Sequence, residues 1–395
     1  MALHIAYTSE QEKLRRELRD YFAKLMTPER RAGLTRGEGD YGDPAAYRDT
    51  IRQLGKDGWL GIGWPKEYGG QARGMMDQLI FMDEASTYNV PIPLLTLNSV
   101  GPTIMQYGTE EQKQQFLAPI LAGEVHFAIG YSEPEAGTDL ASLRTRAVRV
   151  GDEYVINGQK MWTSLTEYAD YVWLAVRTDP DARKHKGLSV LIVPTDAEGF
   201  RYTPVHTMAG ARTNATFYED VRVPVGNRVG DENDGWRLIT NQLNHERVAL
   251  TSAARLVEMI RAVREWAQNT KLASGERVID QQWVQVLLAR SHAKAEVLKL
   301  MNWKIAWGVG KGLNPADASA TKVYGTELST EVYRYLMEVM GANAVVRDGS
   351  PGAVLAGRVE RAYRGCLILT FGGGTNEVQR DIIAMVGLGL PRAPR

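Results

Sequence analysis

The chain has 395 residues, of which 44% are hydrophobic and 24% charged, and its Lys plus Arg and Asp plus Glu counts are both 47. At roughly 100–200 residues per domain, this length predicts two or three domains with a large core. The zero net charge argues against a general nucleic-acid binder. The single cysteine, Cys366, rules out a disulfide framework or a Cys-based metal cluster, and no two of the six histidines have helical ligand spacing, so structural zinc is not expected.

The beginning of the chain and its apolar runs bear on location. Residues Met1–Tyr7 lack a basic stretch followed by a hydrophobic one, so no signal peptide is indicated. The longest apolar runs, Tyr171–Val176 and Leu188–Pro194, are far below the ~20 residues that a membrane helix needs. We therefore expect a cytoplasmic protein without a membrane span.

The N-terminal part of the chain has helical patterning from Ser9 to about Leu121. Ser9–Glu12 is typical of a helix N-terminus with acidic residues in its first turn. Two further helices are expected at Met75–Thr87 and at Glu110–Leu121, the second capped by Thr109. This pattern predicts an N-terminal helical domain over residues 1–125.

Near Phe127 the hydrophobic period changes from helical to alternating, which is typical of strands. Strands are expected at Thr145–Val150 and Glu153–Ile156, and Asn157-Gly158 indicates a tight hairpin turn after them. Later short strands are expected at Lys160–Trp162, Tyr171–Arg177, Leu188–Val193 and Phe217–Val223. Residues 126–233 therefore form a middle β domain, best described as a small barrel or sandwich.

From Asp234 the helical period returns, which predicts a third, helical domain over residues 234–395. In the stretch Asp234–Ala267, apolar residues recur at steps of three, four and seven, as on the core-facing side of one helix: Trp236, Ile239, Leu243 and Leu250. Glu246 falls on the same stripe, where burial would raise its pKa towards the range of a general base. Alternatively, Glu246 is a core carboxylate paired with Arg or Lys, or a partly exposed one at the edge of the stripe.

Three stretches have residue types suited to ligand binding. Tyr131–Asp139 is rich in hydroxyls and contains a Pro and a Gly that fix a turn, and Lys160–Ser164 sets an aromatic ring beside two hydroxyls. Together they are suited to flank a flat heteroaromatic ring. In Phe371–Gln379, three glycines lead into a helix capped by Thr375 or Asn376, and such a turn exposes N–H donors to an anion or a polarised carbonyl. Taken singly, these stretches also resemble ordinary surface turns.

The order of the motifs is more specific than any one of them. They are, in chain order, Tyr131–Asp139, Asn157–Trp162, Phe217–Pro224, Gly235-Trp236 with His245–Arg247, and Gly372–Arg380. In this order they resemble the acyl-CoA dehydrogenase family over nearly the whole chain. The resemblance implies an α+β multidomain fold with an N-terminal helical domain, a middle β domain and a C-terminal four-helix bundle. It also implies α,β-dehydrogenation of an acyl-CoA, FAD held between the last two domains and a neighbouring subunit, and an electron-transfer flavoprotein as electron acceptor.

The resemblance also bears on the catalytic base. In much of the family, the catalytic glutamate immediately precedes the Gly-Thr of the last motif, where this chain has Gly373. A branch that handles branched or bulky substrates instead has a Glu-Arg pair on the bundle helix, which matches Glu246-Arg247. The resemblance thus implies that Glu246 is the base and that the backbone N–H of Gly373 polarises the thioester carbonyl.

Further roles follow from matching positions in the motifs. The residues expected to contact FAD are Tyr131 and Ser132 at the flavin pyrimidine edge, Trp162 on the ring, Ser164 near N5, and Thr375 and Glu377 along the ADP part. The residues expected to contact the substrate are Thr138, at the CoA pantetheine, and Arg247.

One part of the family pattern is absent. Where family members offer an Arg and a Phe-Gly to the neighbour's FAD, this chain has Thr270, Ala273 and Ser274, and the usual Gln is Glu338. An Arg lost from a pyrophosphate contact forfeits a bond worth roughly 1.5–3 kcal/mol. This asymmetry resembles the catalytic subunit of actinobacterial α2β2 dehydrogenases that act on steroid side-chain CoA thioesters. The alternatives are a homomeric dehydrogenase or oxidase for other branched acyl-CoAs, or a non-catalytic subunit that completes a partner's FAD site.

Overall fold

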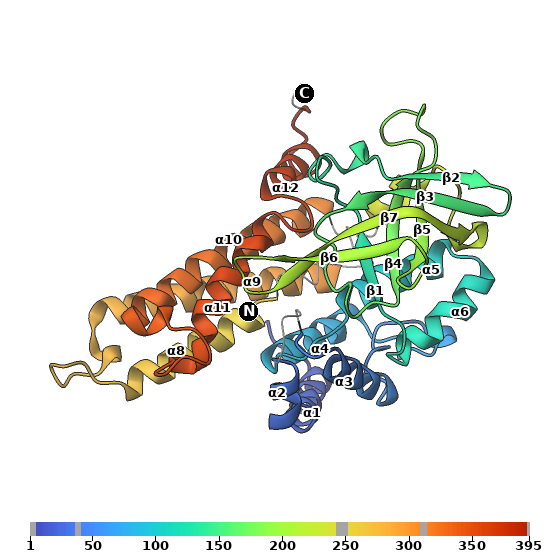
Figure 1. The fold of residues 1–395 in the computed structure, drawn as a ribbon. Helices are drawn as coiled ribbons and strands as arrows, with labels where there is room; N and C mark the ends of the chain where they lie inside the picture. Colours follow the sequence, from blue (N-terminus) through green and yellow to red (C-terminus); the bar gives the residue numbers. More distant parts are fainter. Residues whose placement is uncertain (1–4, 36–40, 242–251, 309–313, 393–395) are drawn as a thin grey trace.

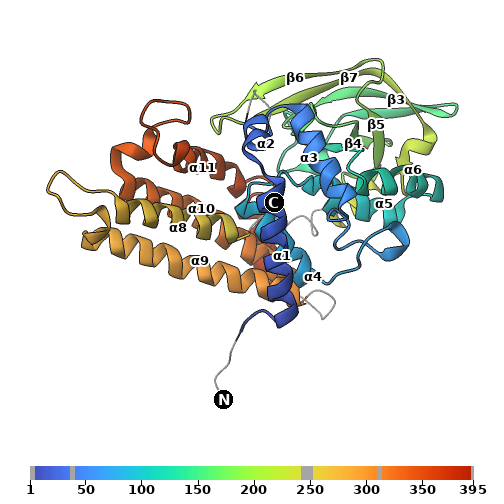
Figure 2. The same ribbon diagram turned by 90° about the horizontal axis from the view of Figure 1, so that it is seen from below.

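The computed structural model describes residues 5–35, 41–241, 252–308 and 314–392. Three units follow one another along the chain: N-terminal helices, a β-sheet and a long C-terminal helical bundle (Figure 1). The bundle extends away from the sheet, and helices α1 and α4 of the N-terminal unit lie against it (Figure 2). Among the described residues, no helix combines the length and hydrophobicity needed to cross a membrane.

The N-terminal unit packs its helices around one apolar core. Its helices are α1 (Ser9–Leu25), α2 (Pro28–Gly33), α3 (Pro44–Lys56), α4 (Met75–Thr87), α5 (Gly101–Tyr107) and α6 (Glu110–Leu121). The expected bounds of α4 and α6, and the Thr109 cap, are confirmed. The expected cap of α1 at Ser9 is wrong by one residue, because Thr8 has the extended backbone of an N-cap and forms a capping box with Gln11.

The middle unit is a mixed sheet of eight strands. They are β1 (Phe127–Gly130), β2 (Arg146–Val150), β3 (Glu153–Lys160), β4 (Tyr171–Arg177), β5 (Leu188–Pro194), β6 (Phe200–His206), β7 (Arg212–Pro224) and β8 (Arg228–Val229). The order is β6-β7-β3-β2-β4-β5-β8, with β1 beside β4. β2 and β4 meet at one residue pair, Arg146 with Arg177, so the sheet divides into two halves. An apolar cluster with residues from both halves, including Ile156, Leu174 and Val221, lies between them as in a sandwich.

The second face of β4 and β5 is also covered. Trp173 and Ile192 belong to the core that contains Phe116 of α6. Strands buried on both faces read as continuous apolar runs rather than alternating ones. This explains the apolar stretches at β4 and β5 without any membrane-spanning role.

The hairpin turn expected at Asn157-Gly158 is wrong. Both residues lie inside β3, at an irregularity in its pairing with β7, and the Asn157 side chain bonds Asp220 of that strand. The β2–β3 turn lies earlier and contains Gly151, whose φ is +62°. The extra residue of this irregularity lies on β7, where Asp220 has a φ of +52°, whereas Asn157 is not among the residues with positive φ. The positive φ values that favour Asn-Gly in tight turns are therefore not what places this pair in β3.

The C-terminal unit consists of α8 (Ala254–Asn269), α9 (Gln282–Gly308), α10 (Pro315–Met340), α11 (Arg358–Cys366) and α12 (Asn376–Ile382). Helices α8 to α11 share an apolar core that includes Val263, Leu298, Leu336 and Val359. Helical residues 235–241 precede them. The expected boundaries at 125/126 and 233/234 fall between α6 and β1, and between β8 and residues 235–241.

The single helix expected over Asp234–Ala267 is interrupted at Ser252 and Ala253, and α8 begins only at Ala254. The Ser252 hydroxyl accepts from Ala254 N and donates to Asp83 of α4, at 3.1 and 2.6 Å. The Ala253 N–H donates to the side chain of Asn302 on α9. These side chains replace the backbone partners of a continuous helix. Ile239 of the expected stripe is buried, whereas Leu243, Glu246 and Leu250 lie outside the described residues.

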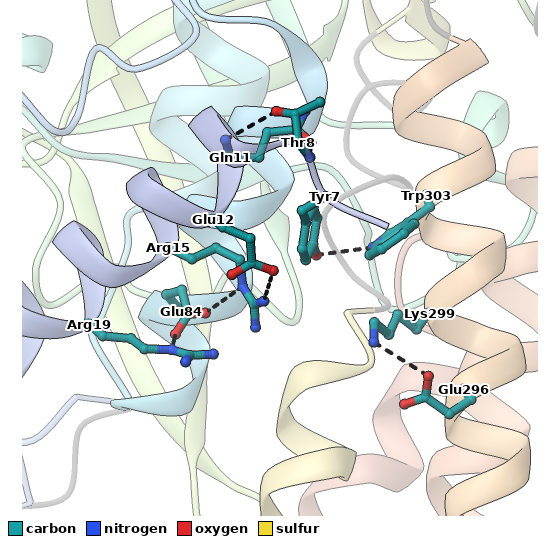
Figure 3. Close-up of polar contacts among 10 residues, drawn as sticks. All are labelled: Tyr7, Thr8, Gln11, Glu12, Arg15, Arg19, Glu84, Glu296, Lys299 and Trp303. Carbon is teal, nitrogen blue, oxygen red and sulfur yellow. Dashed lines mark hydrogen bonds and ion pairs between the residues drawn. The ribbon is translucent and has the colours of Figure 1, made fainter. Parts of the chain in front are cut away.

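A cleft of about 410 Å³ is lined by residues of α1, α4, α8 and α9, beside the contacts that α4 makes with α8 and α9. Its charged side chains are largely paired with each other. Arg15 and Arg19 of α1 both point to Glu84 of α4, and the Trp303 indole N–H donates to the Tyr7 hydroxyl (Figure 3). Burial raises the pKa of Asp83, beside Glu84, to about 6. The cleft is therefore a polar seam that joins the N-terminal helices to the bundle.

Candidate active site

A buried lysine joins two of the motif segments. Lys160, the last residue of β3, donates from Nζ to the Tyr131 carbonyl at 3.0 Å and to Glu133 Oε1 at 2.9 Å. One residue later, the Met161 N–H donates to the Ser132 carbonyl at 2.8 Å. The structure thus brings the loop that begins at Tyr131 alongside the end of β3.

The partners of this lysine are buried with it. Glu133 also accepts from the backbone N–H groups of Arg144 and Thr145, at 2.7 and 2.8 Å. Burial lowers the pKa of Lys160 to about 8, although the Glu133 charge opposes the shift. Burial alone would raise the pKa of Glu133, but the Lys160 charge and these hydrogen bonds outweigh it and hold that pKa below its usual value. The two side chains form a buried ion pair at 2.9 Å.

Trp162, two residues after Lys160, has an unusual backbone conformation. Its φ is +66°, and its side chain is 57% exposed. A non-glycine residue in this region costs on the order of 1–3 kcal/mol and persists where the surroundings impose it. An exposed indole held in this way is suited to stack on a flat ring.

Hydroxyl groups lie on the same segments. The Ser164 hydroxyl is 3.3 Å from that of Thr213 on β7, Ser132 is half-buried, and Thr138 is exposed. Tyr131 differs, because its ring is buried and its hydroxyl accepts from the Trp173 indole at 3.1 Å.

The third motif segment lies on the bundle, between α11 and α12. Gly373 and Gly374 have φ values of +67° and +94°, a region that favours glycine. The Gly372 N–H donates to the Ile368 carbonyl at 2.8 Å, and the Gly374 carbonyl accepts from Lys322 Nζ of α10 at 2.9 Å. The turn 372–374 is therefore anchored at both ends.

The residues after this turn begin α12. Thr375 is its N-cap and accepts from Val378 N at 3.2 Å. Glu377 is exposed, and hydrogen bonds from its own backbone N–H and from Thr375 hold its pKa below the usual value. Gln379 is fully buried, and neither atom of its amide has a partner among the described residues. The φ of +94° at Gly374 strains any other residue, and a Cβ there would meet the end of the Gln379 side chain at 2.8 Å.

Three comparisons with known proteins bear on this arrangement. Models of the acyl-CoA dehydrogenase N-terminal, middle and C-terminal domains match residues 8–124, 128–221 and 233–388. The chain is 68% identical to acyl-CoA dehydrogenase FadE26 of Mycobacterium tuberculosis, over all of both chains. The chain belongs to the acyl-CoA dehydrogenase family. Its fold, predicted from the motif order, is thereby confirmed, and it is an enzyme of this class.

Two solved structures resemble this dehydrogenase closely. One is a crystal structure of the ChsE4-ChsE5 complex from Mycobacterium tuberculosis, with 68% identity and a TM-score of 0.93 over 99% of this chain and 100% of that one. The other, a steroid ACAD named Tcur3481-Tcur3483, has 50% identity and the same TM-score and coverage. Both proteins are complexes of two differently named chains.

The segment expected to hold the base of this dehydrogenase, with Glu246 and Arg247, lies outside the described residues. The roles expected for Glu246 and Arg247 therefore remain predictions. The residues expected to face a neighbour's FAD lie at the far end of the bundle, around the α8–α9 connection (Figure 1). Thr270 is the C-cap of α8, and Glu338 is exposed near the end of α10.

A groove of about 550 Å³ lies at this end of the dehydrogenase. It is lined by Gln282, Trp283, Val286, Leu287, Arg290 and Glu338. Sequence reasoning identified Glu338 but missed Arg290, because helical spacing places Arg290 on α9 without saying which side chain of α10 it faces. It also missed the role of Lys160 and of Lys322, since a lysine in a motif or on a helix gives no sign of burial.

Proposed function

We propose that the enzyme uses FAD to dehydrogenate the Cα–Cβ bond of a branched or bulky acyl-CoA, with steroid side-chain CoA thioesters as its substrates and Glu246 as its base. The backbone of Gly373 carries this proposal. With φ at +67° and no side chain, this position supplies an N–H group but no carboxylate. The base must come from elsewhere, and Glu246 is the carboxylate that the family resemblance supplies.

The residues present fit FAD. The exposed Trp162, with the Ser132 and Ser164 hydroxyls on adjoining segments, is suited to the face and edge of an isoalloxazine ring. Thr375 and Glu377, at the start of α12, are the groups assigned to the ADP part. When bound, FAD supplies the acceptor for the hydride that leaves Cβ.

The other parts of the reaction belong to the chain itself. Glu246 takes the proton from Cα, and the Gly373 N–H donates to the thioester oxygen, where negative charge develops. A donor aimed at such an oxygen is worth about 10²–10³ in kcat. Thr138 and Arg247 bind the CoA thioester.

The surface of the bundle supports a related dehydrogenase subunit as partner. Large apolar side chains on α9 are exposed along one side of that helix: Trp283, Val286, Val297, Leu300 and Trp307. A patch of this kind is typical of a protein interface. Together with the two-chain complexes formed by its relatives, it supports an α2β2 assembly. The partner would supply the contacts to FAD that Thr270 and Glu338 do not make.

The test of the base is Glu246→Gln, with Glu265→Gln on the exposed face of α8 as the matched control. The first variant should keep its flavin content and lose about 10²–10⁴ in kcat, the usual contribution of a general base. The control should lose neither. Near-normal flavin bleaching by an acyl-CoA in the Glu246 variant would refute the assignment of Glu246 as the base.

The substrate class is tested by comparing kcat/KM for a steroid side-chain CoA thioester and for straight-chain acyl-CoAs. A clear preference for straight chains would refute the proposed class. Reoxidation under air and with an electron-transfer flavoprotein separates a dehydrogenase from an oxidase.

A further inference from the structure

Lys322 is a buried lysine that the proposed chemistry does not use. It lies on α10, is 1% exposed, and donates from Nζ to the Gly374 carbonyl at 2.9 Å and to Asn376 Oδ1 at 2.8 Å. A buried ammonium group is costly unless its hydrogen bonds are satisfied. These two partners belong to the glycine turn and the first residue of α12. Both bonds tie the lysine to that turn.

The second partner is itself held in one orientation. The Asn376 amide nitrogen donates to Thr326 Oγ1 at 3.1 Å and to Glu327 Oε1 at 3.2 Å, both on α10. With the nitrogen engaged there, the amide oxygen faces Lys322. Glu327 is fixed in turn by Arg380. Asn376 thus acts as a rigid link between α10 and the start of α12.

The turn itself is made of the residue type with the greatest backbone freedom. Three successive glycines, residues 372 to 374, lose more conformational entropy on ordering than any other residues would. The Gly372 N–H is bonded to Ile368 on one side, and the Gly374 carbonyl is bonded to Lys322 on the other. The Gly373 N–H lies between these two anchors, and no side chain of its own holds it.

We propose that Lys322 is a positioning residue that holds the turn 372–376 so that the Gly373 N–H points at the substrate's thioester oxygen. This inference rests on the proposed function of Gly373. Lys322 does not touch the substrate. It fixes the peptide planes that follow the Gly373 N–H. This N–H group is therefore already in place when negative charge develops on the thioester oxygen.

The test is Lys322→Met, which keeps the length of the side chain and removes its donors and charge. Lys304→Met is the matched control, because Lys304 lies on the exposed end of α9 and pairs with Asp317. Thr326→Val is a milder second variant, which loosens Asn376 and leaves Lys322 in place. It keeps the proposal testable if Lys322→Met does not fold.

Three measurements are made on each flavin-loaded protein: hydrogen exchange of residues 371–379, kcat and KM for an acyl-CoA thioester, and the Kd of the matching S-alkyl-CoA thioether, which lacks the carbonyl. Lys322→Met should speed exchange in this segment and lower kcat about 10²-fold, as expected for a donor misplaced by about 1 Å. Thioether affinity should be unchanged. Thr326→Val should give the same pattern in weaker form.

Unchanged exchange in residues 371–379 would overturn the proposal, as would an unchanged kcat or an equal loss of thioether affinity. Failure of the proposed function gives a different result. In that case Glu246→Gln stays active, whereas faster exchange of the turn in Lys322→Met would still show that Lys322 holds it.

Discussion

Replacing Glu133 by Gln should destabilise the loop that carries Ser132, because it leaves Lys160 buried without its counter-charge. The carboxylate accepts from Lys160 Nζ and from two backbone N–H groups, at 2.7 to 2.9 Å. Gln offers one acceptor in place of two oxygens and sets an NH₂ group against these donors. Removing one partner of such a buried pair costs about 3–5 kcal/mol.

Removing both charges should be far less harmful. Glu133→Gln with Lys160→Met leaves no buried ion, and such replacements are often neutral or stabilising by about 1–4 kcal/mol. The two single variants and the double variant form a cycle that isolates the pair. Because a chain with three units need not unfold in one step, the quantity to measure is the local opening free energy, from hydrogen exchange of Thr145 and Met161.

The pH dependence gives an independent check. The pKa of Lys160 in the folded chain is about 8, below the ordinary 10.5. The unfolded chain therefore binds more protons between these values, so the free energy of opening should rise with pH across that window. Without Glu133 the folded pKa falls further, and the window should extend below pH 8. The reasoning would be refuted if Glu133→Gln had the same opening free energy and hydrogen exchange as the wild type. It would also be refuted if the double variant had a lower opening free energy than both single variants.

Two further predictions concern other parts of the molecule. His126 is buried without a partner for either ring nitrogen among the described residues, and burial followed by the Arg48 charge lowers its pKa to about 4. As pH falls from 6.5 towards 4 the unfolded chain takes up the proton first, so about 3 kcal/mol of stability should be lost there. His126→Phe should remove that part of the acid sensitivity from the local opening free energy, measured by hydrogen exchange at each pH, and parallel pH profiles of the variant and the wild type would contradict this. For assembly, coexpression with a related subunit should give a tetramer with about one FAD per two chains. This ratio is expected if each FAD needs a phosphate-binding cation from the neighbouring subunit and only one of the two subunit types supplies it. Thr270→Arg with Glu338→Gln should raise the flavin occupancy of the chain expressed alone, and a fully loaded wild-type homotetramer would defeat the idea.

Long elements with a strong local pattern were predictable from the sequence. The bounds of α4 and α6 match their apolar spacing and caps, and β4 follows its apolar run. The errors arose where a local signal has two possible contexts. Asn157-Gly158 is favoured in tight turns, but its pairing with β7, where Asp220 takes the positive φ, keeps it inside a strand. The break in the helix at Ser252 depends on Asp83, 169 residues away in sequence. The spacing of apolar residues along a helix cannot predict a contact with such a distant residue.

In the candidate site, too, the sequence predicted the segments but not the tertiary contacts that hold them. Motif order located the loop at Tyr131, the end of β3 and the glycine turn, but not what holds them. In both places a buried lysine donates to a backbone carbonyl of the loop, from Lys160 to Tyr131 and from Lys322 to Gly374. Charge-assisted hydrogen bonds of this kind are short, directional and strengthened by a low local dielectric. The same low dielectric penalises the ammonium whenever the loop moves away, so each loop and its lysine order together. Under the proposed function, in which Gly373 donates its N–H and Trp162 stacks on the flavin, the two lysines hold the backbone near both residues.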